Sequence, residues 1–137
     1  MSSIRVLVVE DFAPFWRFIR STLAKRLELQ VIGEVTDGLE GVRRAQALEP
    51  DLVLLDIGLP TLNGIEAARQ IRKLAPESKI IFLSQECSPD VVQEAFNAGA
   101  RGYVVKTSAA IDLLAAVEAV LDDRQFVSVE SSGQTRT

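Results

Sequence analysis

The sequence predicts an α/β fold in which a five-stranded parallel sheet lies between two layers of helices, and three observations support this prediction. Short runs rich in Val, Ile and Leu alternate along the chain with amphipathic segments of roughly 10–15 residues. The apolar runs are continuous, which is typical of strands buried on both faces. The length of 137 residues, with 47% hydrophobic and 25% charged residues, is typical of one globular domain.

The first strand–helix unit begins with the apolar run IRVLVV at residues 4–9. A helix is expected next, because apolar side chains recur every four positions and so share one helical face. These side chains are Phe15, Ile19, Leu23 and Leu27. Pro14 suits the first turn of that helix, where a missing N–H costs no hydrogen bond.

The second unit has a strand at residues 31–35 and a helix that begins after Asp37. Asp37 is a favourable N-cap, and Glu40 stands at the reciprocal position of a capping box. The apolar face of this helix comprises Leu39, Val42, Ala45 and Leu48. Pro50 then ends it, since proline cannot continue a helix.

The third unit has a buried strand at residues 52–55 that ends at Asp56. A loop follows, marked by the turn-forming residues Gly58, Pro60, Asn63 and Gly64. The next helix has an apolar face made of Ile65, Ala68, Ile71 and Leu74. Pro76 closes this helix.

The last two units have strands at residues 79–83 and 102–105. Ser88 or Asp90 is the expected cap of the helix between them, which ends near Gly99. Its apolar residues are Val91, Val92, Ala95 and Phe96. The final amphipathic helix is predicted from Ile111, Leu114, Val117, Val120 and Leu121.

Polar side chains stand where the predicted strands end. The first strand is followed by Glu10 and Asp11, the third by Asp56, the fourth by Ser84 and the fifth by Lys106. Because ligands bind at the carboxyl ends of parallel strands, we expect these side chains to meet at one edge of the sheet. Taken singly, each has a structural explanation as a turn, cap, loop or solvated residue. Together, in this order, they favour a functional site.

Three neighbouring carboxylates repel one another unless a cation offsets their charge. Mg²⁺ prefers oxygen ligands, and the carboxylates together with a backbone carbonyl such as that of Gly58 would suit it. A carboxylate nucleophile can form an aspartyl phosphate, and Asp56 at the end of the central strand is the expected nucleophile. Lys106 would add positive charge and Ser84 a hydroxyl donor toward the phosphoryl oxygens.

The composition excludes several other functions. The chain has no histidine, which rules out histidine-based catalysis, and its single Cys87 cannot form an internal disulfide. A net charge of −4 makes it a poor nucleic-acid binder by its overall field. No long apolar run suggests a membrane span, and no secretory signal is recognisable at the N-terminus, so a cytoplasmic location without membrane partners is expected.

These spaced motifs resemble the response-regulator receiver domain of bacterial two-component signalling, over about residues 4–122. The resemblance rests on VED at 9–11, on Asp56, Pro60 and Gly64, on Ser84, and on GYVVK at 102–106. The segments GIEAAR at 64–69 and AGARGY at 98–103 resemble the LuxR-type (NarL-like) class. The resemblance implies a flavodoxin-like three-layer sandwich with strand order 2-1-3-4-5 and five helices.

The resemblance also implies residue roles. Asp56 would accept phosphate from a sensor histidine kinase, and Mg²⁺ would be held by Asp11, Asp56 and the Gly58 carbonyl, with Glu10 acting through water. Lys106 and Ser84 would contact the phosphoryl oxygens. Tyr103 would be an aromatic switch behind Ser84; alternatively it is an edge-strand aromatic that packs locally. Such a domain is a signalling module that catalyses only its own phosphotransfer and autodephosphorylation.

Some residues depart from the common pattern of this family. Gln85 stands where a small residue is usual, so it would narrow access to Asp56 and slow transfer or loss of phosphate. Glu86 adds a negative charge nearby, Phe12 follows the acidic pair, and Thr107 replaces a common proline. None of these changes removes a central group of the site.

The expected domain organisation is a receiver domain at residues 1–124 and a tail or linker at 125–137, where Ser, Thr, Gly and Gln predominate. Regulators of the LuxR type control transcription through a helix-turn-helix domain, which this sequence does not contain. We expect the sequence to be the first part of a longer regulator, which would reach DNA only through that absent domain; the alternative is a receiver that stands alone. A homodimer is a further expected assembly.

Three other functions compete with this one. A phosphatase or mutase with an aspartyl nucleophile would need a second acid at position 58, which is glycine. A flavin- or nucleotide-binding module would need a Gly/Ser/Thr-rich phosphate loop where Glu10, Asp11 and Phe12 stand. The main alternative is a receiver-like interaction module that is never phosphorylated.

Overall fold

The computed structural model describes residues 3–128 of the chain. Six parallel strands form one sheet in the order β2-β1-β3-β4-β5-β6. The strands are β1 (Ile4–Val9), β2 (Leu29–Val35), β3 (Leu52–Asp56), β4 (Lys79–Ser84), β5 (Gly102–Val105) and β6 (Phe126–Val127). The helices are α1 (Ala13–Leu23), α2 (Gly38–Leu48), α3 (Gly64–Leu74), α4 (Pro89–Asn97) and α5 (Ala109–Leu121), with a short 3-10 turn η1 (Lys106–Ser108) before α5.

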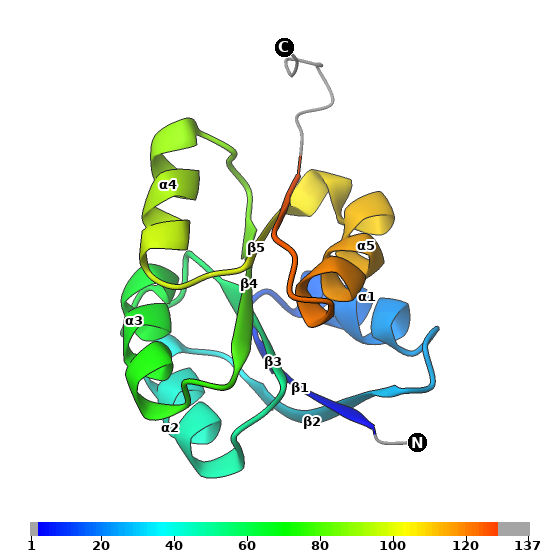
Figure 1. The fold of residues 1–137 in the computed structure, drawn as a ribbon, viewed down its shortest axis with the longest axis horizontal. Coiled ribbons are helices and arrows are strands. Elements are labelled where there is room, and N and C mark those ends of the chain that lie inside the picture. Colours follow the sequence, from blue (N-terminus) through cyan, green and yellow to red (C-terminus); the bar gives the residue numbers. More distant parts are fainter. Residues whose placement is uncertain (1–2, 129–137) are drawn as a thin grey trace.

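The sheet is the middle of three layers. Helices α2, α3 and α4 cover one face, and α1 and α5 cover the other (Figure 1). Alternate residues of β3 contribute to opposite sides: Val53 and Leu55 pack under α2, α3 and α4, whereas Leu52 and Leu54 pack under α1 and α5. Both faces of the central strands are therefore apolar, as the continuous hydrophobic runs predicted. This is the flavodoxin-like sandwich expected from the sequence.

The first predicted helix is shorter than its periodicity indicated. Helix α1 ends at Leu23, and Leu27 is 98% exposed and outside the helix. The chain turns after Leu23 through the bonds from Arg26 N–H to Leu23 O and from Leu29 N–H to Arg26 O, so that β2 can begin at Leu29. The need to return to the sheet overrides the local apolar spacing.

Helix caps agree with the sequence in position and add detail. Asp37 Oδ1 accepts the Glu40 N–H at 2.8 Å, while the Glu40 side chain pairs with Arg44. Ser88, one of two expected candidates, accepts the Val91 N–H and caps α4. These side chains satisfy N–H groups that have no partner within the helix.

The predicted count of five strands was wrong by one, because β6 lies beside β5 as a sixth strand. Phe126 N–H donates to Arg101 O at 3.1 Å and Ser128 N–H donates to Tyr103 O at 2.9 Å. Without β6, the carbonyls of Arg101, just before β5, and of Tyr103, within it, would lack strand partners. The polar composition around residues 125–137 gave no strand signal, and residues 129–137 lie outside the described part of the chain.

Gly64, the first residue of α3, packs against the end of β3, where a Cβ would stand 2.3 Å from Asp56 O and 2.7 Å from Ile57 Cα. We predict that Gly64→Ala destabilises the fold by about 1–3 kcal/mol, the usual range for overpacking against a rigid neighbour. Urea unfolding of the two proteins measures this difference. Gly58→Ala is the matched control, since a Cβ there has nothing within 4 Å; equal losses for both variants would contradict the steric explanation.

Candidate functional site

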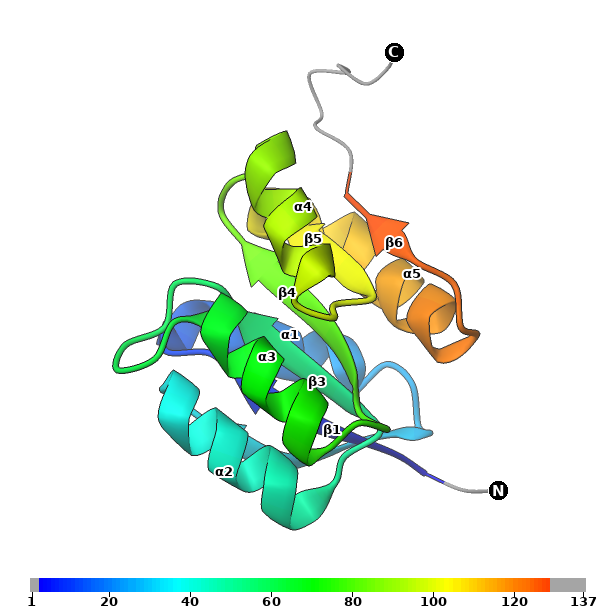
Figure 2. The same cartoon turned by 60° about the vertical axis from the view of Figure 1, so that its left-hand side comes forward.

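The carboxyl ends of β1, β3, β4 and β5 meet at one edge of the sheet, as the strand order requires (Figure 2). Glu10 follows β1, Asp56 and Ser84 are the last residues of β3 and β4, and Lys106 follows β5. A cavity of about 370 Å³ opens there. It is lined by Asp11, Phe12, Asp56, Gly58, Ser84, Gln85, Glu86 and Lys106.

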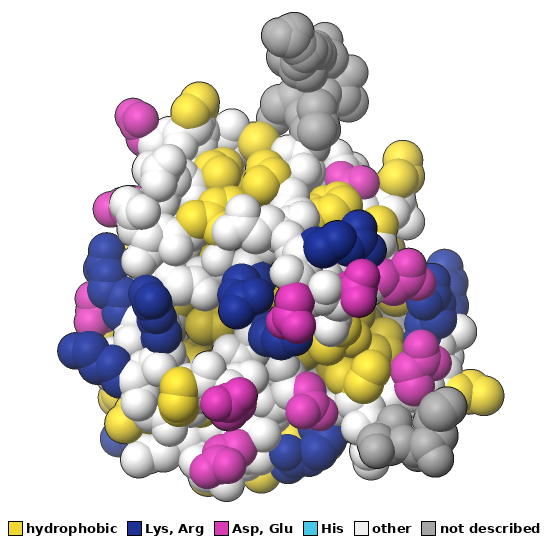
Figure 3. All heavy atoms as spheres, in the orientation of Figure 1, with side chains coloured by type: hydrophobic (Ala, Val, Ile, Leu, Met, Phe, Trp, Pro, Cys, Tyr) yellow, Lys and Arg dark blue, Asp and Glu magenta, His cyan; other side chains and the backbone are white. Residues whose placement is uncertain are grey.

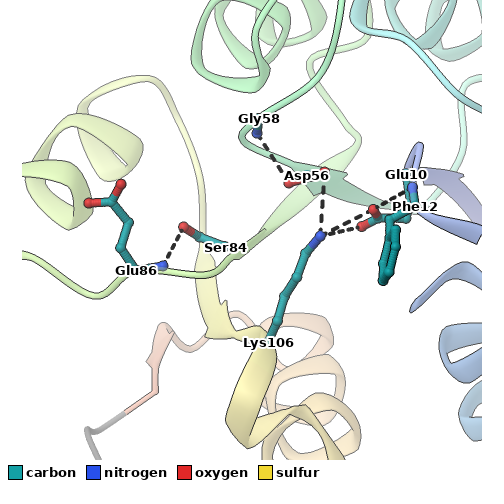
Figure 4. Close-up of polar contacts among 7 residues, drawn as sticks. All are labelled: Glu10, Phe12, Asp56, Gly58, Ser84, Glu86 and Lys106. Carbon is teal, nitrogen blue, oxygen red and sulfur yellow. Dashed lines mark hydrogen bonds and ion pairs between the residues drawn. The ribbon is translucent and has the colours of Figure 1, made fainter. Parts of the chain in front are cut away.

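Lys106 is held between two carboxylates. Its Nζ lies 3.0 Å from Glu10 Oε1 and 3.1 Å from Glu10 Oε2, and 3.4 Å from Asp56 Oδ2 (Figure 4). The Lys106 side chain is only 11% exposed, so water screens these attractions weakly. Its ammonium therefore provides a fixed positive charge beside Asp56.

Phe15 adds a contact that its sequence position did not indicate. The Lys106 Nζ lies 4.8 Å from the centroid of the Phe15 ring, within the range of a cation–π interaction. The helical spacing of Phe15 predicted only a core-facing aromatic side chain. Its contact with a residue 91 positions later depends on how α1 lies beside η1, which no local pattern encodes.

Glu10, Asp11 and Asp56 form an acidic cluster in which one oxygen of each lies within 4.8 Å of the others. Glu10 is buried, and this burial is the main cause that raises its pKa above the ordinary value. The charge of Asp56 also raises it, whereas the Phe12 N–H and Lys106 favour the ionised form.

The donor set of this cluster fits a hard divalent cation. All its side-chain donors are carboxylate oxygens, which Mg²⁺ prefers. Glu10 Oε2 accepts the Phe12 N–H at 3.0 Å, whereas the buried Oε1 accepts no hydrogen bond from the described residues, although Lys106 lies near it. An incompletely satisfied buried oxygen beside two further carboxylates is consistent with a cation-binding site.

Asp56 is held in one orientation. Its Oδ1 accepts the Gly58 N–H at 3.1 Å, and its Oδ2 faces Lys106 (Figure 4). The residue is 7% exposed and lines the cavity. The carboxylate is thus accessible from the cavity while both oxygens have partners.

A second set of contacts connects Ser84 with Tyr103 through the backbone of the loop after β4. Ser84 Oγ accepts the Glu86 N–H at 3.1 Å, and Tyr103 OH donates to Glu86 O at 2.6 Å. Tyr103 is fully buried in the core under α4, and burial raises the pKa of its phenol. The Glu86 carboxylate points away from Asp56 (Figure 4).

A larger cavity, of about 540 Å³, lies at the opposite edge of the sheet. Two of the basic residues that line it, Lys79 and Arg101, form ion pairs with Asp123. The hydrogen bond from Lys79 lowers the pKa of the exposed Asp123 carboxyl. It lacks the acidic cluster, so its size alone does not make it the better candidate.

Comparisons with known proteins agree with this geometry. The profile of the family described as response regulator receiver domain matches residues 6–118. The transcriptional regulatory protein LiaR of Bacillus subtilis is 38% identical over 85% of this chain and 55% of LiaR, so the chain spans about half the length of that relative. The chemotaxis protein CheY of Thermotoga maritima is 40% identical over 74% of this chain and 84% of CheY.

Solved structures give the same result. The chain superposes on a LuxR-family two-component response regulator from Aurantimonas sp. SI85-9A1 with a TM-score of 0.86 and 33% identity, covering 91% of this chain and 89% of that one.

Within residues 3–128, no helix has the length and apolar character needed to cross a membrane.

The raised pKa of Glu10 predicts a pH-dependent stability in the absence of divalent cations. A carboxyl whose pKa is higher in the folded state binds its proton more tightly there, so its ionised form destabilises the fold. This cost is absent well below the ordinary pKa and develops as pH rises through the raised pKa. We predict that Glu10→Gln unfolds at a higher temperature than the parent at pH 7 in EDTA, and that the difference shrinks in acid.

In excess MgCl₂ the parent should unfold at a higher temperature than Glu10→Gln, because the variant lacks one of the three carboxylates. Ligand at about 100 times its Kd stabilises a protein by about 2.7 kcal/mol, and the parent should gain more than Glu10→Gln. Thermal unfolding followed by circular dichroism measures both effects. Glu94→Gln, which changes an exposed carboxylate of α4, is the control; equal magnesium shifts in the parent and Glu10→Gln would contradict the assignment of the site.

Proposed function

We propose that this chain accepts a phosphoryl group on Asp56 from a sensor histidine kinase. The premise is that the chain belongs to the response regulator receiver domain family and is of the LuxR type. Receiver domains are in general phosphorylated signalling domains that bind Mg²⁺ at an acidic site. The observation that carries the residue assignment is the Asp56 carboxylate facing the cavity, with Lys106 Nζ 3.4 Å from its Oδ2.

Asp56 is the proposed nucleophile. One of its carboxylate oxygens forms the bond to phosphorus while the bond between phosphorus and the donor nitrogen of the kinase phosphohistidine breaks. The Gly58 N–H holds Oδ1 and the Lys106 ammonium faces Oδ2, so the carboxylate needs little reorientation. Lys106 also offsets negative charge on the transferred group.

Glu10, Asp11, Asp56 and the Gly58 carbonyl are the proposed ligands of Mg²⁺. When bound, Mg²⁺ would neutralise charge on the phosphoryl oxygens and so lower their repulsion by the carboxylates. Glu10 has a further role through Lys106, because both of its oxygens lie within 3.1 Å of the ammonium. Glu10 thereby keeps the Lys106 ammonium next to Asp56.

Ser84 and Tyr103 are the proposed switch residues. Ser84 Oγ accepts the Glu86 N–H and can still donate its own proton to a phosphoryl oxygen on Asp56. Such a bond stabilises only those conformations in which Ser84 reaches Asp56, and it shifts the population toward them. Tyr103 would respond to movement of the same loop, because its hydroxyl donates to Glu86 O.

The output is proposed to be transcription. LiaR is described as a transcriptional regulatory protein, and the chain spans about half its length. We propose a receiver domain over residues 1–124, with residues 125–137 leading toward a DNA-binding domain. DNA would then be contacted only through that domain, and the regulator would work in the cytoplasm, as a homodimer when active. Self-phosphorylation and autodephosphorylation would be its only catalysis.

Incubation with Mg²⁺ and a small phosphodonor such as acetyl phosphate tests the assignment. Intact-mass measurement should detect one added phosphoryl group, which Asp56→Asn abolishes because an amide is a poor nucleophile. Asp90→Asn, at an exposed position of α4, is the matched control and should retain the adduct. An adduct that persists in Asp56→Asn would place the phosphate elsewhere, and a parent without any adduct would favour the unphosphorylated interaction module.

Gln85 is exposed and lines the same cavity as Asp56. We infer that its side chain restricts the approach of water to Asp56. We predict that Gln85→Ala hydrolyses its phosphate faster. A change of about 1 kcal/mol in the barrier corresponds to roughly fivefold in rate. The decay of the phosphorylated form after removal of the phosphodonor measures this. Gln93→Ala on α4 serves as the control, and an unchanged half-life in Gln85→Ala would refute the shielding role.

A further inference from the structure

The edge of the sheet beside β5 is filled by a segment that follows α5. Residues 126–128, called here the β6 segment, run parallel to β5 and lie beside α5 (Figure 2). Hydrophobic side chains gather on the surface between α4 and β6 (Figure 3). Val127 is 41% exposed, whereas Phe126 is partly buried against the core beneath α1 and α5. Hydrogen bonds at the end of the segment add to this apolar contact.

Ser128 connects three parts of the domain. Its N–H donates to Tyr103 O at 2.9 Å, and its Oγ accepts the Val105 N–H at 3.0 Å. The same Oγ donates to Asp112 Oδ2 of α5 at 2.8 Å. Its carbonyl accepts a bond from Cys87 Sγ at 3.6 Å, in the loop after β4. Ser128 is 2% exposed, which is unusual for a serine just beyond a two-residue strand.

Two of these contacts are close to the site. Val105 directly precedes Lys106, so the amide bound by Ser128 lies next to the residue that carries the ammonium. Cys87 directly follows Glu86, whose N–H bonds Ser84 and whose carbonyl accepts the Tyr103 hydroxyl. Glu86 and Cys87 in the loop after β4 therefore connect Ser84 and Tyr103 with Ser128.

We propose that the β5 edge is a strand-docking surface for the chain's own β6 segment, and that docking is coupled to phosphorylation of Asp56. This rests on the proposed function. When Ser84 Oγ moves to donate to the phosphoryl group, its bond with the Glu86 N–H draws the loop of residues 85–87 toward the cavity. Cys87 then moves away from Ser128, and the β6 segment is loosened.

The direction of this coupling is reciprocal. If phosphorylation weakens docking of the β6 segment, then weakening the dock must favour the phosphorylated conformation by the same factor. Because the chain continues from Ser128 toward residues 129–137, release of this segment would transmit the state of Asp56 to whatever follows. The partner that this edge fits is thus the start of the chain's own C-terminal region.

Amide hydrogen exchange of the full chain tests the forward direction. The probe is beryllium fluoride with Mg²⁺, a stable mimic of the phosphoryl group. The amides of Val105 and Ser128 should exchange roughly fivefold faster or more when the mimic is bound, since coupling between two sites is commonly of this size. The amides of Gly58 and Glu86, which bond Asp56 and Ser84, report whether the mimic has bound.

Substitutions test the reverse direction. Ser128→Ala removes the Oγ contacts with Val105 and Asp112, and Asp112→Asn weakens one of them by an independent route. Both should tighten the binding of beryllium fluoride with Mg²⁺ by a similar factor, since the reciprocity applies to equilibrium affinities. Ser78→Ala is the matched control, because its hydroxyl bonds Pro50 O at the opposite edge of the sheet. Circular dichroism verifies that each variant is folded.

The outcomes separate this inference from the proposed function. A response at Gly58 and Glu86 with unchanged exchange at Val105 and Ser128 would overturn the coupling alone. Slower exchange at these two amides, or weaker binding of beryllium fluoride by Ser128→Ala, would also overturn it. No response at any of the four amides, together with no mass adduct, would overturn the proposed function and the coupling with it.

Discussion

Three carboxylates from two strand ends lie within 4.8 Å of one another, and the Lys106 ammonium offsets part of their repulsion. This balance of charge governs the site. Burial raises the pKa of Glu10, so the cluster costs stability when it is ionised without a metal. The same incomplete compensation makes the cluster receptive to a cation.

The parallel sheet supplies what this arrangement requires. All strands run in one direction, so their carboxyl ends share one edge, and residues far apart in the chain meet there. The apolar residues of β3 anchor it on both faces, so that Asp56 at its end has a rigid support. Rigid strands place the charged groups, while the loops after β3 and β4 supply backbone amides that bond to them, those of Gly58 and Glu86.

The loop after β4 contacts both the site and Ser128 of the β6 segment, which pairs along the side of β5. It therefore gives a physical basis for communication between them. Glu86 contacts Ser84 and Tyr103 through its backbone, and Cys87 contacts Ser128. A small displacement of this loop would alter several hydrogen bonds at once. The β6 segment is short, so few bonds hold it, and such an element is suited to respond to a shift of this size.

The sequence by itself determined the order of the five main strand–helix units, because continuous apolar runs and helical periodicity are local signals. It also identified Glu10, Asp11, Asp56, Ser84 and Lys106 as candidates, since each follows a recognisable strand. Local spacing failed at Leu27, where the return of the chain to the sheet decides where the helix ends. Tertiary structure alone decided that Phe15 lies against Lys106, that the Glu86 carbonyl accepts the Tyr103 hydroxyl, and that Ser128 completes the edge of β5. These contacts join residues through backbone groups or across separate elements, and no pattern of side-chain types along the chain specifies such a meeting.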